Sequence, residues 1–194
     1  MHHTVAMSFD GLYIGNEQLL IPGFSGFEEM RTMNEFSSLR LYANYDDADL
    51  HQVSAITFAS AEPAQQGIGF PVWNLLGLVH AYGGVWYELY YTIGTVPASG
   101  NSDKTMVFVG QPGTMQFYVP GLVAIDGIHQ TNDQGEVEVY VRANGDNAAE
   151  VHQVTIGGSR PNREIPAGAT DLGIIHPWGN WQYVYATDTI VPAA

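Results

Sequence analysis

The 194-residue chain contains no cysteine, and Lys104 is its only lysine. The absence of thiols excludes disulfide bonds, zinc–thiolate sites and cysteine nucleophiles. Six Lys and Arg residues stand against twenty Asp and Glu residues, so the net charge is −14 at pH 7. Residues 1–30 contain neither Lys nor Arg. An acidic chain without a basic arm disfavours direct binding to nucleic acid, whose phosphates need cationic partners.

Long hydrophobic runs are also missing. The longest mostly apolar stretch, Phe70 to Val79, spans about ten residues and contains Pro71 and Asn74, which is too short for a membrane-spanning helix. The first five residues do not combine a basic region with an apolar run, so we expect no signal peptide. No Asn-x-Ser/Thr sequon occurs. These absences predict a soluble, unanchored protein.

The shortage of lysine on an acidic chain suits a protein that must stay soluble in concentrated salt. At about 1 M salt the Debye length is ~3 Å, so repulsion between surface carboxylates is largely screened. Asp and Glu account for only 20 of 194 residues, however. An ordinary acidic protein that uses little lysine is therefore the alternative to a halophilic one.

The residues that are present predict an all-β fold. Hydrophobic residues make up 45% of the chain and aromatic residues 12%, enough for a core, which excludes an intrinsically disordered protein. Val137, Val139 and Val141 alternate with polar residues, as in a half-buried strand. The turn signal Asn144-Gly145 follows, so residues 136–156 are predicted to form a hairpin. β-branched and aromatic residues predict further strands at 37–43, 51–59, 73–81, 85–93, 105–109, 115–119 and 181–187.

These strands, separated by 22 Gly and 10 Pro spread along the chain, show no domain boundary. They predict one antiparallel β-sandwich domain over residues 1–194, an eight- to ten-stranded jelly roll with little helix. Phe27, Met30 and Met33 recur at a near-helical spacing, which predicts a short helix within 27–36. We find no internal repeat in the sequence.

Histidine residues are the first candidates for a metal site. His80, His129, His152 and His176 are isolated, and no pair has the spacing that metal ligands commonly show. The cupin pattern fails because His80 has no histidine two residues away and its nearest glutamate is Glu88. We therefore predict no metal site.

A cluster of carboxylates, Asp46, Asp47 and Asp49, follows Asn44 and could hold calcium. Counted from Asp47, however, position six of an EF-hand loop is Gln52 and position twelve is Phe58, where glycine and glutamate are required. The interpretation we favour is a solvated turn between two strands. Whether Asp46–Asp49 binds an ion stays open.

No arrangement of residues indicates catalysis. Glu136 and Glu138 could form a glycosidase pair, but a strand with a charged solvent face predicts the same residues. Gly23–Gly26 lacks the spacing of a nucleophile elbow, and residues 67–72 end in Val72 where a dinucleotide motif has Gly or Ala. We therefore predict a non-enzymatic protein with no catalytic, cofactor-binding or metal-binding residues and no cofactor.

Aromatic residues are the remaining signal, and they gather in two segments of the chain. Exposed aromatic side chains on a β-sandwich can stack on sugars, but they can equally fill a core or anchor a protein–protein interface. Three function classes follow: a structural assembly protein, a carbohydrate-binding or adhesin-like sandwich, and an enzyme on a β scaffold, which no arrangement of residues supports. The aromatic residues concerned are Trp73, Tyr82, Trp86, Tyr87, Tyr90 and Tyr91 in the middle, and Trp178, Trp181, Tyr183 and Tyr185 near the C-terminus.

In architecture and composition the whole chain resembles the small single-jelly-roll major capsid proteins of icosahedral viruses with an internal membrane. The acidic, lysine-poor composition is closest to those of halophilic archaeal viruses. This resemblance rests on no short motif, and no functional residue is carried over. It implies a viral capsid protein of the virion that self-associates, pairs with other coat proteins in an icosahedral shell and lies near an internal membrane. A carbohydrate-binding module is the alternative.

Overall fold

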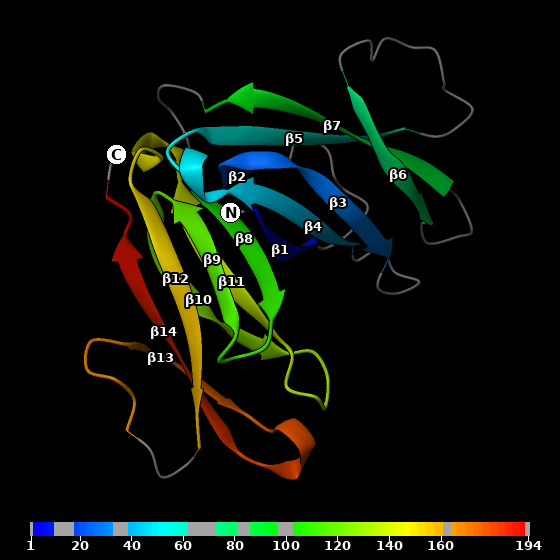
Figure 1. The fold of residues 1–194 in the computed structure, drawn as a ribbon. Coiled ribbons are helices and arrows are strands. Elements are labelled where there is room, and N and C mark those ends of the chain that lie inside the picture. Colours follow the sequence, from blue (N-terminus) through cyan, green and yellow to red (C-terminus); the bar gives the residue numbers. More distant parts are fainter. Residues whose placement is uncertain are drawn as a thin grey trace. The chain divides into compact units, whose positions relative to one another are not determined.

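The computed structural model describes residues 2–9, 18–32, 39–61, 73–80, 86–96, 103–160 and 164–192 (Figure 1). Antiparallel strands account for 71% of the structure, which confirms the predicted all-β class. Helix within the described residues is limited to the short 3-10 turns Asp47–Asp49, Gly145–Asn147 and Pro177–Gly179. None of the described helices could cross a membrane.

The chain divides into two compact units, Met1–Val96 and Pro97–Ala194. In the first unit, β1 and β3 flank β4, and a second sheet has the order β2-β5-β7-β6. All neighbouring strands are antiparallel. The strands of this unit are β1 (His2–Phe9), β2 (Gln18–Pro22), β3 (Phe24–Thr32), β4 (Leu39–Asp46), β5 (Val53–Ala61), β6 (Asn74–His80) and β7 (Trp86–Thr95).

The second unit is built in the same way. β10 and β8 flank β11, and a second sheet has the order β13-β14-β12-β9. Here too the neighbours are antiparallel. The strands of this unit are β8 (Asp103–Gly110), β9 (Met115–Pro120), β10 (Leu122–Gln130), β11 (Val137–Asn144), β12 (Val151–Ser159), β13 (Thr170–Ile175) and β14 (Gln182–Ile190).

The two units are therefore structural repeats, with β1 to β7 matching β8 to β14 in order and pairing. Even the irregularities recur. β3 has register shifts between Phe24 and Gly26 and between Phe27 and Glu29, and β10 has them at the matching positions 122/124 and 125/127. The expectation of no internal repeat was wrong. Few residues are identical between the two halves; Pro22-Gly23 and Pro120-Gly121 are one example. The repeat is therefore hard to recognise in the sequence.

A glycine at the same place in each unit joins the two sheets. Gly121, between β9 and β10, has φ +61, a conformation that favours glycine. Its N–H donates to the Glu150 carbonyl at 2.7 Å, and its carbonyl accepts from the Asn144 N–H at 2.8 Å. The first unit repeats this arrangement around Gly23 (φ +60), with bonds of 3.0 Å to Gln52 and 2.8 Å to Asp46.

The predicted hairpin over 136–156 was wrong, because its two strands belong to different sheets. β11 pairs with β10 and β8, whereas β12 pairs with β9 and β14. A two-residue hairpin of type I′ needs positive φ at Asn144, but its φ is −117. The Asn144 side chain instead accepts a hydrogen bond from the Asp146 N–H and begins the 3-10 turn that leads to the other sheet.

The predicted helix within 27–36 was also wrong over its described part, because Phe27–Thr32 belongs to strand β3. A bulge lies between Phe27 and Glu29. Since a bulge adds one residue to a strand, residues three apart such as Phe27 and Met30 can face the same side and imitate a helical period. Residues 33–36 lie outside the described residues.

All nine predicted strand segments are strands in the structure, as β4 to β9, β11, β12 and β14. The described residues form fourteen strands, where the pattern predicts eight to ten. β1, β2, β3, β10 and β13 account for the difference. The jelly-roll topology and the single domain stay predictions.

Each unit has its own aromatic core. In the first, the ring of Phe27 lies 5.9 Å from that of Phe58 and 5.0 Å from that of Tyr91, and so connects β3 to β5 and β7. In the second, the rings of Phe108 and Phe117 are stacked at 3.9 Å and join β8 to β9. Burial of one such side chain contributes about 1.5–3 kcal/mol. These contacts hold the two sheets of each unit together.

Candidate functional site

The turn between β13 and β14 carries two exposed tryptophans. Trp178 is 70% exposed and Trp181 60%. Trp178 has φ +51, and it is the only non-glycine residue with positive φ in the described parts of the chain. Such a conformation is strained for a bulky side chain and is kept only where the surroundings impose it. Here the Trp178 N–H donates to the Asp133 carbonyl at 2.8 Å, and the Asn180 N–H donates to the Pro177 carbonyl at 2.9 Å.

Neighbouring groups hold the second tryptophan and its turn. The imidazole of His176 lies 4.4 Å from the ring of Trp181, centroid to centroid. The backbone N–H of His176 donates to Oε1 of Gln130 at 2.7 Å, so β10 supports the start of the turn. Gly135 lets the 131–136 loop approach closely, because a Cβ there would lie 2.7 Å from the Cβ of Pro177. The tryptophans are thus exposed on a turn that is fixed from two sides.

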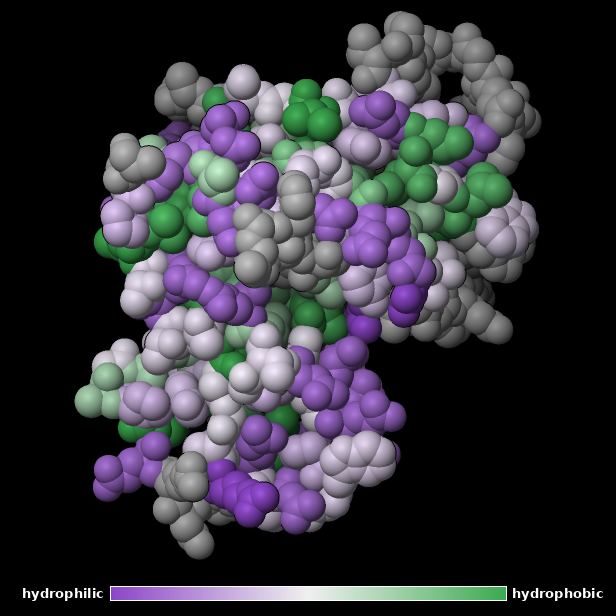
Figure 2. All heavy atoms as spheres, in the orientation of Figure 1, coloured by the Kyte–Doolittle hydropathy of each residue, from purple (hydrophilic) through white to green (hydrophobic). Residues whose placement is uncertain are grey.

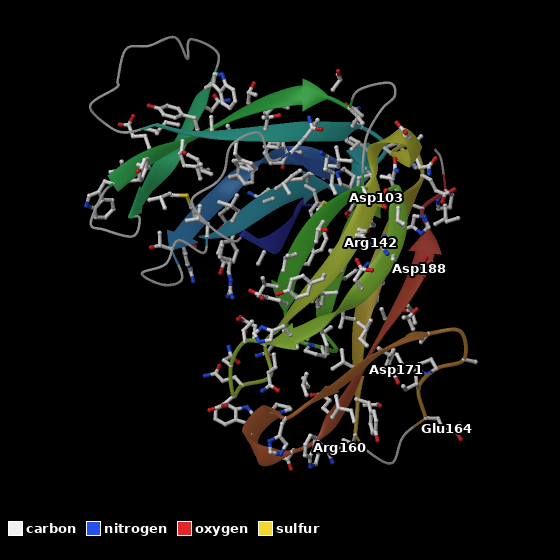
Figure 3. All side chains as sticks on the ribbon, turned by 180° about the vertical axis from the view of Figure 1, so that it is seen from behind. Asp103, Arg142, Arg160, Glu164, Asp171 and Asp188 are labelled. Carbon is white, nitrogen blue, oxygen red and sulfur yellow. The ribbon has the colours of Figure 1, made fainter. Side chains whose placement is uncertain are left out.

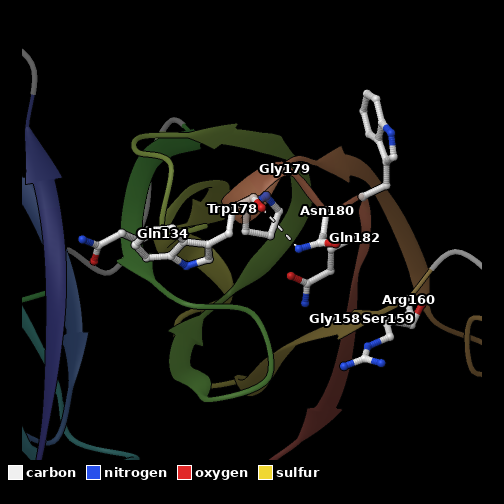
Figure 4. Close-up of a pocket in the computed structure, with 10 residues that line it drawn as sticks. Gln134, Gly158, Ser159, Arg160, Trp178, Gly179, Asn180 and Gln182 are labelled. Atoms are coloured by element: carbon white, nitrogen blue, oxygen red, sulfur yellow. Dashed lines mark hydrogen bonds between the residues drawn. The ribbon is translucent and has the colours of Figure 1, made fainter.

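A groove of about 1100 Å³ opens at this turn, and Figure 4 shows the residues that line it. They come from three segments: Gln134 in the loop after β10, Gly158–Arg160 at the end of β12, and Pro177–Gln182. The lining includes two indole rings, three carboxamides and one guanidinium, and no Asp or Glu is among its described residues. The carboxamides belong to Gln134, Asn180 and Gln182.

Glycine shapes one wall of this groove. A Cβ at Gly158 would lie 1.9 Å from Nε2 of Gln182, so this glycine leaves room beside β12 for the end of the Gln182 side chain. Asn180 is held by a hydrogen bond from its Nδ2 to the Trp178 carbonyl at 3.3 Å.

The hairpin that carries the groove is also where the two repeats are most alike in sequence. Residues 172–179 read Leu-Gly-Ile-Ile-His-Pro-Trp-Gly, and residues 76–83 read Leu-Gly-Leu-Val-His-Ala-Tyr-Gly. A tryptophan follows each copy, Trp181 in one and Trp86 in the other. His80 and Trp86 lie opposite each other in the backbone register of β6 and β7. This repeated pattern is the sequence signal from which the site could have been predicted. In the first copy, residues 81–85 lie outside the described residues.

The histidine candidates have separate surroundings. Nδ1 of His152 lies 3.0 Å from Oδ2 of Asp188, and its Nε2 lies 2.9 Å from Oε1 of Glu150. Both ring nitrogens face carboxylates, so neither is directed to a metal ion. His129 is exposed, with Nδ1 3.7 Å from Oε2 of Glu138. Within the described residues, no group of three or more His, Cys, Asp or Glu side chains could hold a metal ion.

The acidic cluster forms a 3-10 turn, Asp47–Asp49, that leads from β4 to β5, as the predicted turn between strands requires. The Asp46 carboxylate accepts from the Ala48 N–H at 3.1 Å and caps the turn. Oδ1 of Asp49 accepts from Nε2 of Gln52 at 3.2 Å. Two of the carboxylates therefore serve local structure.

The other catalytic candidates are likewise dispersed. Glu136 accepts a hydrogen bond from Oγ1 of Thr131 at 2.9 Å, whereas Glu138 accepts from the Tyr140 hydroxyl at 3.1 Å. Gly23–Gly26 is the β2–β3 turn with the start of β3. Residues 67–72 lie outside the described residues.

The middle aromatic segment is partly structural. Tyr91 packs on Phe27, and the Tyr90 hydroxyl donates to the buried carboxylate of Glu88, a bond that raises the pKa of the Tyr90 phenol. Trp86 is 51% exposed. Tyr82 lies outside the described residues.

No protein-family model, curated protein or solved structure compared with the chain matches it. Function is therefore inferred from the groove and from the exposed surface.

Proposed function

We propose that the protein is a non-enzymatic carbohydrate-binding module and that the groove at the β13–β14 turn is its binding site. The observation that carries this proposal is the lining itself. Exposed Trp178 and Trp181 line one groove together with the carboxamides of Gln134, Asn180 and Gln182. Of the function classes that the sequence leaves, this lining favours the carbohydrate-binding one.

The chemistry of sugars fits these side chains. A pyranose ring has a face of C–H groups that can lie against an indole, and its hydroxyls both donate and accept hydrogen bonds. A carboxamide offers a carbonyl acceptor and an NH₂ donor, and so it can satisfy either role. Tryptophan combines a large apolar surface with one polar N–H, which suits a ligand of mixed polarity.

The size of the groove indicates the size of the ligand. Small-molecule pockets measure about 300–1,000 Å³. At about 1100 Å³ and open to solvent, this groove suits a segment of an oligosaccharide better than one free monosaccharide. Hydrogen bonds to Asp133 and within the turn already hold the Trp178 backbone, so binding would not have to order the turn itself.

The proposal is tested with a glycan array, followed by calorimetry on the best ligand. We expect Trp178→Ala and Trp181→Ala each to weaken binding by about tenfold, because each removes an aromatic platform. Trp86→Ala is the matched control, because Trp86 is a comparably exposed tryptophan that does not line the groove. Binding that survives both groove substitutions, or an array without any ligand, would refute the proposal.

A second candidate is the viral capsid subunit, and a different surface favours it. β6 and β7 expose Leu75 (58%), Leu78 (53%), Trp86 (51%) and Ile93 (52%). Figure 2 shows hydrophobic side chains at the surface over these strands. Apolar side chains exposed on neighbouring strands are found at protein–protein interfaces. On this proposal the chain assembles with itself and with other coat proteins in a virion, near an internal membrane.

Light scattering and electron microscopy of the purified protein test the capsid candidate. We expect concentration-dependent assembly that Leu78→Glu abolishes, because a charge in the apolar surface would be desolvated on association. Val123→Glu is the control, because Val123 is similarly exposed, on β10 of the other unit. A strict monomer that is never found in particles would refute this candidate.

A further inference from the structure

We propose that the groove selects anionic carbohydrates and that Arg160 pairs with the carboxylate or sulfate of the sugar. This inference rests on the proposed carbohydrate-binding function and names the class of ligand. Among the described residues of the lining, Arg160 is the only charged one, on a protein of net charge −14. The groove thus has the opposite sign of charge from the molecule as a whole.

Arg160 differs from Arg31 and Arg142, the other exposed arginines that the structure describes, in having no carboxylate partner among the described residues. Nε of Arg142 lies 2.7 Å from Oδ2 of Asp126, and its Nη1 lies 3.6 Å from Oδ2 of Asp103. Figure 3 labels Arg142, Asp103 and Arg160. Arg31 pairs with Glu29 at 2.7 Å. Arg160, in contrast, forms no ion pair with any carboxylate in the described ranges. Its guanidinium remains available to a ligand.

The chemistry of the guanidinium defines the ligand. Arginine binds carboxylates and sulfates through two parallel N–H groups, a geometry that lysine cannot reproduce. A polyanion such as nucleic acid would be repelled by the net charge of −14 at low ionic strength. An oligosaccharide fits better, because its isolated acid group can enter the groove while its apolar ring faces contact the tryptophans.

The test compares three probes by calorimetry at low salt: trigalacturonate, its fully methyl-esterified form and a sulfated galactan oligosaccharide. We expect at least one anionic probe to bind about tenfold or more tightly than the methyl ester. Arg160→Gln should weaken binding of the anionic probe about tenfold and so abolish this preference. Arg160→Lys should restore part of it, and added salt should reduce it. Arg31→Gln is the matched control, an exposed arginine outside the groove.

The possible failures are distinguishable. Equal binding of the ester and both anionic probes by the wild type would overturn the inference and leave the carbohydrate-binding function standing. A preference for anionic probes that persists in Arg160→Gln would have the same consequence. If no probe binds the wild type while the glycan array yields a neutral ligand, the inference alone fails. If the array also yields no ligand, the proposed function fails with it.

Discussion

Gly121→Ala should destabilise the second unit strongly, because two independent costs meet at this residue. Gly121 has φ +61, and an alanine in this left-handed region costs about 1–2 kcal/mol. The added Cβ would also lie 2.1 Å from the carbonyl oxygen of Asn144. That oxygen belongs to the backbone, so the contact is relieved only by moving the β9–β10 turn away from β11.

Such a movement disturbs the two hydrogen bonds of Gly121, to Glu150 at 2.7 Å and from Asn144 at 2.8 Å. Loss of one of them costs about 1 kcal/mol. The total expected loss of unfolding free energy is therefore about 2–3 kcal/mol. Gly113→Ala is the control, because Gly113 has φ +95 but nothing within 4 Å of its Cβ position. Its cost should be that of the backbone conformation alone.

Urea denaturation followed by circular dichroism measures both variants. Gly23→Ala provides a replicate in the other repeat, since its Cβ would lie 2.5 Å from the Asp46 carbonyl oxygen. We expect Gly23→Ala to behave like Gly121→Ala. If Gly121→Ala destabilised the protein no more than Gly113→Ala does, the reasoning about this turn would be refuted.

Three further outcomes are expected. Phe117→Ala should cost about 3–5 kcal/mol of unfolding free energy, because its buried ring stacks on Phe108, and a thermal midpoint near that of wild type would contradict this. A hydrogen bond from the Arg142 guanidinium lowers the pKa of Asp126 in the folded protein. The ion pair therefore stabilises the fold at pH values above the unfolded-state pKa of about 3.9, and this stabilisation is lost as the pH falls through the lower folded-state pKa. The advantage of wild type over Asp126→Asn in denaturation should therefore shrink from pH 6 towards pH 3, and a constant difference would exclude this role. The net charge of −14 predicts a melting temperature that rises from low to molar NaCl by more than sucrose alone explains, and a flat response would favour an ordinary low-salt habitat.

The class of fold and most strands could be predicted because burial on one side of a strand leaves a direct trace in the sequence. Val137, Val139 and Val141 are all fully buried, as their alternation with polar residues predicts. β3 and β10 were missed because each contains two register shifts, which break the alternation. The pattern of β3 therefore imitates a helical period.

Partners of strands are harder to predict than strands. Asn144-Gly145 is a strong local signal for a hairpin, but the side chain of Asn144 caps a 3-10 turn and the chain passes to the other sheet. The same happens at Asp46, the equivalent residue of the first unit. Local turn chemistry thus fixes where a strand ends, while the packing of two sheets decides where the next strand lies.

The candidate groove could be predicted only in part. Trp178 and Trp181 stand out in the sequence as part of an aromatic segment. Gln134 and Arg160 do not, because they reach the groove from separate loops that only the fold brings together. Even for the tryptophans, the sequence does not distinguish an exposed indole from one in the core.

The most direct test of carbohydrate binding is a two-dimensional ¹H–¹⁵N spectrum of the four indole N–H groups, recorded while an oligosaccharide selected on the glycan array is added. Single Trp→Phe substitutions assign the signals. The account predicts that the signals of Trp178 and Trp181 shift and saturate together, while those of Trp73 and Trp86 stay in place. Saturation with no movement of the Trp178 and Trp181 signals, or movement of Trp86 alone, would contradict it.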